Sequence, residues 1–359
     1  MEILSCENVA FKYNESTDYA ISDCTFSVKK GEKIMLCGAS GSGKSTLLRL
    51  LKRELSPRGE LSGNITLMGK DRSELSDRES AEKIGFVMQS PDSQTVCDKV
   101  SAELAFGLES FGVKSGEIQS RVGEMAAFFG IEPLYDRDIS TLSGGQKQLV
   151  ALCSVMATDP DILLLDEPTA QLDPVAAREL LGILDRLNKE MGVTIIIAEH
   201  DPEELFDSCD KILYLAKGKT EFFGTPALTA KHFVKNALEG FLPETAKVFA
   251  RLCDDLPLNV RQGRAKLEKL GVTDIPKQAV TDTERAEPYA LQCKNLWQRY
   301  EKNSPDILKG CDLGIRKGEC YGLLGSNGGG KSTLLRVICG LCKPYMGNVS
   351  LFGKKQKAY

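Results

Sequence analysis

An internal repeat is the sequence feature that most limits how this chain can fold. Residues 4–46 and 291–333 show the same succession of apolar and polar segments in the same register. Each stretch ends in a glycine-rich run, GASGSGKST in the first copy and GSNGGGKST in the second. The period is far longer than the roughly 20–50 residues of a solenoid repeat. The sequence therefore predicts a duplicated domain.

The repeat divides the chain into three predicted parts. Residues 1–225 form a complete first domain, residues 226–287 a helical segment and linker, and residues 288–359 the N-terminal part of a second domain. Residues 226–270 contain stretches with apolar residues at helical spacing, punctuated by Pro226, Pro243 and Pro257. The stretch that follows is polar and is typical of a linker.

The first copy has the pattern of an α/β domain. Short β-rich runs occur at residues 33–37, 64–68, 162–165 and 193–198, with helical patterns between them. The last two runs are continuously apolar, as expected for strands that are buried on both faces. We therefore expect a mostly parallel sheet with helices on its faces.

The first glycine-rich run matches the pattern of a phosphate-binding loop, because an apolar strand precedes it and a helix follows. Glycines allow successive backbone N–H groups to point into one concavity, and the helix adds its positive end. Lys44 would reach the terminal phosphates of ATP, and the Ser45 hydroxyl would bind Mg²⁺. A turn that binds nothing is the alternative, and the second complete match argues against it. The candidate residues are Gly38, Ser40, Gly41, Ser42, Gly43, Lys44, Ser45 and Thr46, and Gly325, Asn327, Gly328, Gly330, Lys331, Ser332 and Thr333.

Two carboxylates follow the apolar run at residues 162–165. Neighbouring side chains of a strand point to opposite sides, so Asp166 and Glu167 can have different roles. Asp166 would hold Mg²⁺, and Glu167 would orient and polarise the attacking water as a general base. Such a pair alone is equally typical of a solvated loop, but its combination with a phosphate loop favours the catalytic interpretation.

A third motif, Ser143-Gly144-Gly145-Gln146, opens a predicted helix. The N-terminus of a helix is an anion-binding site, although the same residues could simply cap the helix.

The order of these motifs resembles that of ATP-binding cassette (ABC) ATPases. The ordered set is the phosphate loop, Gln89, LSGGQ, LLLDEP, Asp173 and His200. The resemblance implies a P-loop NTPase fold, with antiparallel β and α-helical subdomains beside a parallel core sheet. It also implies that two cassettes meet head to tail, in cis or in trans, with ATP between one phosphate loop and the other LSGGQ.

The resemblance also assigns roles to single residues. Tyr13, and Tyr300 at the equivalent position of the repeat, match the aromatic residue that stacks on adenine, although Tyr13 alone would be an ordinary surface residue of a strand. Gln89 matches the residue that senses Mg²⁺ and the attacking water. Asp173 matches the loop that couples the two sites, and His200 the residue that contacts the γ-phosphate.

Softer matches, such as FVMQSPDSQ and DEPTAQLDP, resemble the ATPases of energy-coupling factor importers of vitamins or metal ions. The resemblance implies a place at the cytoplasmic face of the membrane, a transmembrane coupling subunit and a substrate-binding membrane subunit, which chooses the substrate. Leu149 departs from the pattern, because an arginine commonly follows LSGGQKQ. Up to Tyr359 the second copy has no LSGGQ, acidic pair or histidine, so we expect hydrolysis to depend on Glu167 and on the LSGGQ of a second copy of the chain.

Net charge and the length of apolar runs argue against two further classes, nucleic-acid-binding proteins and membrane-spanning proteins. The net charge of −4 does not favour a broad electrostatic contact with nucleic acid, so none is expected as a partner. No apolar run approaches the ~18 residues of a membrane-spanning helix. Two alternatives stay open: a soluble ABC protein that acts on ribosomes or DNA, and a non-catalytic nucleotide-binding fragment.

Overall fold

The structure is a computed structural model that describes residues 1–271, 288–301 and 304–356. It divides into two units, residues 1–274 and 275–359, which are described separately. Most of the predicted polar linker lies outside the described residues.

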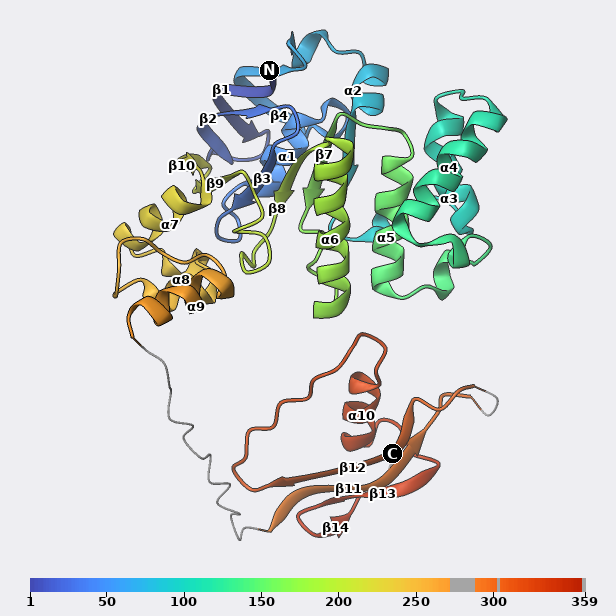
Figure 1. Cartoon of the computed structure of the whole chain (residues 1–359). Helices are drawn as coiled ribbons and strands as arrows, with labels where there is room; N and C mark the ends of the chain where they lie inside the picture. The colour runs from blue at the N-terminus through green and yellow to red at the C-terminus, as the bar shows by residue number, and fades with distance from the viewer. Residues whose placement is uncertain (272–287, 302–303, 357–359) are drawn as a thin grey trace. The chain divides into compact units, whose positions relative to one another are not determined.

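A six-stranded sheet forms the centre of the first unit, with the strand order β10-β9-β3-β8-β7-β6 (Figure 1). Strands β3, β6, β7, β8 and β9 are parallel, and β10 pairs with β9 in the antiparallel direction. The predicted mostly parallel sheet is thus confirmed. The bounds are β3 (Lys33–Cys37), β6 (Ile84–Val87), β7 (Ile162–Asp166), β8 (Thr194–Ala198), β9 (Lys211–Ala216) and β10 (Lys219–Gly224).

The two faces of this sheet belong to two different apolar cores, because side chains alternate along each strand. On one face, Met35, Leu165 and Ile197 share a core with α5 (Gly144–Met156) and α6 (Pro174–Met191). On the other face, Leu36 and Ile196 share a core with α1 (Lys44–Leu51) and an antiparallel sheet. That sheet has the order β2-β1-β4-β5, with bounds β1 (Glu2–Tyr13), β2 (Ile21–Lys29), β4 (Gly59–Leu67) and β5 (Lys70–Asp71).

A helical subdomain is built from α3 (Val100–Ser110), α4 (Ser115–Phe129) and α5. Leu104, Val122 and Leu152 are buried in its shared core. Helix α4 ends at Gly130, which adopts the left-handed conformation (φ 66°) that favours glycine. The parallel sheet, antiparallel sheet and helical subdomain together form the ABC nucleotide-binding fold expected from the sequence.

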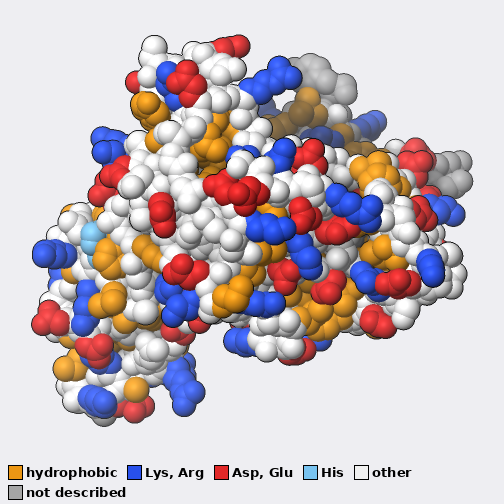
Figure 2. Space-filling model, turned by 90° about the horizontal axis from the view of Figure 1, so that it is seen from above, with side chains coloured by type: hydrophobic (Ala, Val, Ile, Leu, Met, Phe, Trp, Pro, Cys, Tyr) orange, Lys and Arg blue, Asp and Glu red, His pale blue; other side chains and the backbone are white. Residues whose placement is uncertain are grey.

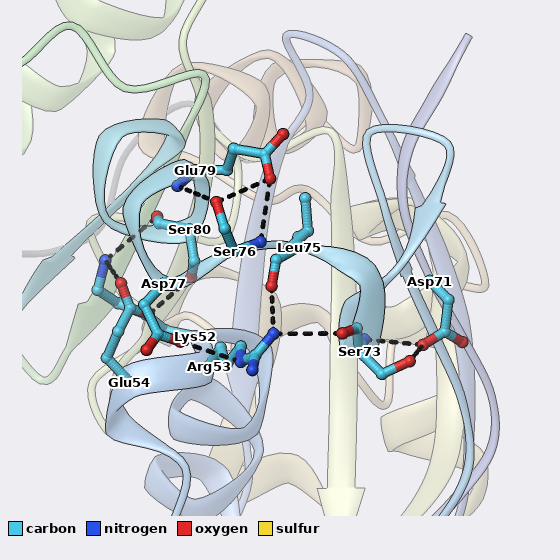
Figure 3. A network of polar contacts seen from close by, with 10 residues as sticks. All are labelled: Lys52, Arg53, Glu54, Asp71, Ser73, Leu75, Ser76, Asp77, Glu79 and Ser80. Carbon is cyan, nitrogen blue, oxygen red and sulfur yellow. Dashed lines mark hydrogen bonds and ion pairs between the residues drawn. The ribbon is translucent and has the colours of Figure 1, made fainter.

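A polar network joins the end of α1 to α2 (Asp77–Lys83) and to the turn before it (Figure 3). Arg53 donates to the carbonyl oxygens of Ser73 and Leu75, and it pairs with Asp77 at 3.1 Å. Ser76 and Glu79 form a capping box at the start of α2. These contacts attach the segment that follows β5, and the start of α2, to the residues just after α1.

The helices of the segment after residue 225 pack into the core of the first unit. They are α7 (Pro226–Lys235), α8 (Glu244–Phe249) and α9 (Val260–Lys269). Phe233 and Phe249 are buried in the same core as the central sheet. The Phe233 ring packs edge-on against the Tyr214 ring of β9, with the two ring centroids 5.1 Å apart. The sequence predicted helices here, and the structure shows which surface they cover.

The second unit repeats the start of the first. Its sheet has the order β12-β11-β13-β14, with bounds β11 (Tyr289–Gln298), β12 (Leu308–Arg316), β13 (Met346–Leu351) and β14 (Lys354–Lys355). Helix α10 (Lys331–Ile338) follows the second glycine-rich loop. Residues 320–324, which correspond in the repeat to β3, form no strand, and Leu324 is 92% exposed. In the first unit β3 lies between β8 and β9, and the described part of the second unit has no strands in these places.

Candidate nucleotide site

The first phosphate loop has a backbone that only glycine can adopt at two positions. Gly38 and Gly43 have φ values of 153° and 102°. A Cβ atom on Gly38 would lie 2.2 Å from the Leu215 carbonyl oxygen, and one on Gly43 would lie 2.7 Å from the Ala20 carbonyl oxygen. The loop is therefore held close to the neighbouring strands, and its glycines serve both the turn and the packing.

Lys44 lies folded into this loop. Its side chain is buried, and its Nζ donates to the carbonyl oxygens of Gly38 at 2.8 Å and Ala39 at 3.3 Å. Burial lowers the pKa of the Lys44 ammonium. Ser42 Oγ is also buried, and it has no hydrogen-bond partner within the described residues. A buried hydroxyl without a partner is rare in proteins, so the loop fits a ligand that brings its own oxygens.

Ser45 and Asp166 form the predicted metal-binding pair. Ser45 Oγ, in the first turn of α1, donates to Asp166 Oδ1 at the end of β7 at 2.8 Å. Oxygen atoms of this kind are the ligands that Mg²⁺ prefers, and Mg²⁺ usually completes its shell with water and phosphate oxygens. The residues present therefore fit a Mg²⁺ ion bound together with a nucleotide.

Glu167 lies where three predicted site residues meet. Its Oε1 is 2.6 Å from His200 Nε2 and 4.0 Å from Lys44 Nζ, and its Oε2 accepts a hydrogen bond from Gln89 Nε2 at 3.1 Å. The partners come from different elements: Gln89 follows β6, and His200 follows β8. Glu167 itself has φ 49°, a left-handed conformation that is uncommon outside glycine and often marks a functional site. The carboxylate is thus held beside the place where the terminal phosphate is expected.

The two tyrosines predicted to stack on adenine are tied to the phosphate loops. Tyr13 OH is 2.8 Å from Thr46 Oγ1, and Tyr300 OH is 3.1 Å from Thr333 Oγ1. The last residue of β1, and in the second unit the residue two positions after β11, are thereby fixed to the first turn of the helix after the loop. These bonds hold each ring at the edge of its loop, and the stacking itself stays a prediction.

A set of Tyr13 variants separates the ring from its hydrogen bond. We expect Tyr13→Ala to lose a stacking contact worth on the order of 1 kcal/mol, which is about a fivefold weaker affinity for ATP. Tyr13→Trp should retain binding. Tyr13→Phe keeps the ring and removes only the bond to Thr46, so it is the matched control and should bind like the wild type. Calorimetric titration measures all four proteins, and equal affinities throughout would exclude Tyr13 from the site.

The LSGGQ residues face another part of the chain. Ser143 Oγ accepts from Gln146 N, and Gln146 Oε1 accepts from Ser143 N, so these side chains form a capping box at the start of α5. A Cβ atom on Gly145 would lie 2.9 Å from Ala176 of α6, and one on Gly144 would lie 4.0 Å from the Gln171 carbonyl oxygen. Asp173 caps α6 by accepting from the backbone N–H groups of Val175 and Ala176. Gly144 and Gly145 thus lie beside residues at or just before the start of α6.

The second phosphate loop reproduces the first in its lysine contacts. Lys331 Nζ donates to the carbonyl oxygens of Gly325 and Ser326, both at 2.7 Å. Gly328 and Gly330 have φ values of 79° and 86°. Asn327 lies within this loop and Ser332 in the first turn of α10. The loop therefore has a conformation that can bind phosphates, although the residues directly before it form no strand.

One residue beside this site was missed by sequence reasoning. Glu199 is only 4% exposed, and its Oε1 accepts from Thr169 N at 3.0 Å and from Thr169 Oγ1 at 2.7 Å. The available signal was its position directly after an apolar strand and directly before His200. Glu167 follows β7 in the same way, directly after Asp166 at the end of that strand.

Comparison with known proteins agrees with this geometry. A family model described as "ABC transporter" matches residues 21–170 and 308–358. A protein of Bacillus thuringiensis subsp. konkukian, named as an ABC transporter ATP-binding protein, is 40% identical over 97% of this chain and 63% of its own length. A similarly named protein of Methanosarcina mazei is 35% identical over 98% of this chain and 63% of its own. The chain thus spans less than two thirds of the length of these relatives.

Solved structures show the same likeness. The structure of cbiO1 from Clostridium perfringens, described as part of the ABC transporter complex cbiONQ, is 32% identical, with a TM-score of 0.59 over 74% of this chain and 98% of that one. An ATP-binding cassette solved as a dimer bound to ADP and Pi is 27% identical, with a TM-score of 0.54 over 62% of this chain and 98% of that one. Within the described residues, no helix is long and apolar enough to cross a membrane. With its motifs, fold and relatives in agreement, the chain belongs to the ABC transporter family.

Proposed function

We propose that the first unit hydrolyses ATP, with Glu167 as the general base. The observation that carries this proposal is the position of the Glu167 carboxylate, which contacts Gln89 and His200 and lies 4.0 Å from the phosphate-loop lysine. A general base must lie within hydrogen-bond reach of the proton that it takes, and neighbouring donors can orient the attacking water.

The other residues would bind the phosphates and the metal. Lys44 would exchange its two carbonyl partners for phosphate oxygens, and the backbone N–H groups of the loop would add further donors. Ser45 and Asp166 would hold Mg²⁺, which neutralises charge on the phosphate oxygens when it is bound. His200 would contact the γ-phosphate beside Glu167. Steady-state phosphate release from MgATP, measured for the wild type and the Glu167→Gln protein, tests this assignment.

We propose further that a second cassette, in cis or in trans, completes the site. The start of α5 carries a helix N-terminus with the donors of an anion site, and its glycines lie beside the start of α6. Another copy of LSGGQ would therefore have to close over the nucleotide. The similar cassette solved as a dimer with ADP and Pi supports this arrangement.

We propose that the hydrolysis energises a membrane importer of the energy-coupling factor type, for vitamins or metal ions. The similarity to cbiO1, which belongs to an ABC transporter complex, supports this proposal. A transmembrane coupling subunit and a substrate-binding membrane subunit would be the partners, and the chain would act at the cytoplasmic face of the membrane.

The alternative is an ABC protein that acts on ribosomes or DNA. In Figure 2, Lys and Arg side chains are interspersed with Asp and Glu over the visible face. Such a mixed surface offers no continuous positive stripe for a phosphate backbone. The segment after residue 225 also differs from the long, highly charged helical pair that joins the cassettes of such translation factors, because α7, α8 and α9 are short and pack into the core. Both observations favour the importer.

The importer proposal predicts conditional membrane attachment. The chain alone should remain in the supernatant when it is mixed with lipid vesicles, and it should sediment with membranes only when the coupling subunit is present. Flotation with and without membrane subunits measures this difference, and sedimentation of ribosomes is the parallel assay for the alternative. Tight binding to bare vesicles, or co-sedimentation with ribosomes, would contradict the proposal.

A further inference from the structure

Glu199 is a buried carboxylate whose hydrogen bonds come from neutral donors. It is 4% exposed, and it also interacts electrostatically with the Lys44 ammonium and the Glu167 carboxylate. Burial raises the pKa of its carboxyl group, and the hydrogen bonds from Thr169 and from the His200 backbone N–H oppose that effect. Burying a carboxylate is costly, so its place among three donors calls for a physical reason.

The position of Glu199 provides that reason. Three successive residues at the end of β8, residues 198–200, each contact the loop that carries Glu167. The Ala198 carbonyl oxygen accepts from Glu167 N at 3.0 Å, and His200 Nε2 contacts Glu167 Oε1 at 2.6 Å. Between them, the Glu199 carboxylate accepts hydrogen bonds from the backbone N–H and the hydroxyl of Thr169, which lies two residues beyond Glu167. Glu199 N itself donates to the Leu36 carbonyl oxygen of β3, so the backbone that carries this carboxylate is attached to the strand before the phosphate loop.

The backbone conformation of Glu167 needs support from the surrounding residues. A left-handed φ of 49° is disfavoured for glutamate and persists only where the surroundings enforce it. The Ala170 N–H donates to the Glu167 carbonyl oxygen, which closes a turn over residues 167–170, and Thr169 lies inside this turn. The bonds from Thr169 to Glu199 are therefore a second side-chain link between this turn and the end of β8, beside the contact of His200 with Glu167.

We propose that Glu199 is a positioning residue that fixes the Glu167 carboxylate for attack by water, acting through Thr169. This inference rests on the proposed hydrolytic role of Glu167. It assigns no contact between Glu199 and the nucleotide. Loss of Glu199 should therefore lower turnover, which depends on where the Glu167 carboxylate points, and leave ATP affinity, which depends on the phosphate loop, unchanged.

The test compares turnover and ATP affinity in a small set of variants of this chain. Glu199→Ala removes the acceptor, and we expect kcat to fall by about 100-fold, as for a reacting group displaced by about 1 Å, while the Kd for ATP changes by less than about twofold. Glu199→Gln keeps an acceptor for Thr169 and should retain kcat within about threefold. Thr169→Val removes one of the two donors at nearly constant shape and should lower kcat by about tenfold. Glu204→Ala, which removes an exposed carboxylate five residues further on, is the matched control and should leave both quantities unchanged.

Coupling to Glu167 distinguishes this inference from the proposed function. If Glu199 acts through Glu167, adding Glu199→Ala to Glu167→Gln should lower turnover by less than about twofold further. Full turnover in the Glu199→Ala protein, with Glu167→Gln inactive, would overturn the inference and leave the proposed function intact. Full turnover in Glu167→Gln would overturn the function itself. If Glu199→Ala does not fold, Thr169→Val decides: an unchanged kcat, or an equal loss of ATP affinity, would overturn the inference.

Discussion

The Glu167→Gln protein is expected to bind MgATP like the wild type and to lose turnover by about 10²–10⁴-fold, the usual contribution of a general base. Glutamine keeps the size of the side chain but cannot accept a proton from water. Its contacts with Gln89 and His200 can re-form with the amide, so the phosphate loop should keep its shape. Steady-state phosphate release at saturating MgATP measures the loss, and nucleotide titration measures the binding.

Glu204→Gln is the matched control for this substitution, because it makes the same chemical change on an exposed side chain paired with Arg178. It should turn over ATP at the wild-type rate. Substantial activity in the Glu167→Gln protein would show that another residue acts as the base or that the second loop is catalytic. Loss of ATP binding in the same protein would show that Glu167 holds the loop together rather than the water.

Local patterns in the sequence were enough for much of this site. The phosphate loop and the two carboxylates after β7 were predicted because each motif is contiguous and its neighbours along the chain define a strand or a helix. What the sequence could not show is the meeting of Gln89, Glu167 and His200, since they follow three different strands. Their order along the chain resembled that of a known family, and only the sheet order places them side by side.

Two features of the fold depend on contacts between residues distant in the sequence, which the spacing of apolar residues does not show. The spacing in α7–α9 predicts helices, but the burial of Phe233 and Phe249 in the core of the first unit depends on contacts with residues distant in the sequence, such as Tyr214 of β9 for Phe233. The repeat makes residues 320–324 resemble β3, yet they form no strand, and the described part of the second unit contains no counterpart of β8 or β9 with which they could pair. Glu199 was missed for a related reason, since its partner Thr169 follows a different strand.

Lys44→Ala is expected to weaken MgATP binding at the first site by at least about 30-fold, because losing one partner of a buried charged pair costs about 2–5 kcal/mol. Lys44 is buried at the base of the loop, where its ammonium donates to two carbonyl oxygens that it would exchange for phosphate oxygens, with the Glu167 carboxylate 4.0 Å away. The backbone N–H groups of the loop remain in the variant, so weak binding should persist rather than vanish. Isothermal calorimetry with a non-hydrolysable ATP analogue measures the affinity.

Lys331→Ala is the matched control for this substitution, since Lys331 has the equivalent carbonyl contacts in the second loop. In this chain it should leave both the first-site affinity and the turnover nearly unchanged. The second loop has no ordered strand in front of it, and the described part of the second unit offers no carboxylate in the place of Asp166 or Glu167. Equal losses in the two variants would mean that both loops contribute to one site. Unchanged affinity in Lys44→Ala would exclude the first loop as the phosphate-binding site.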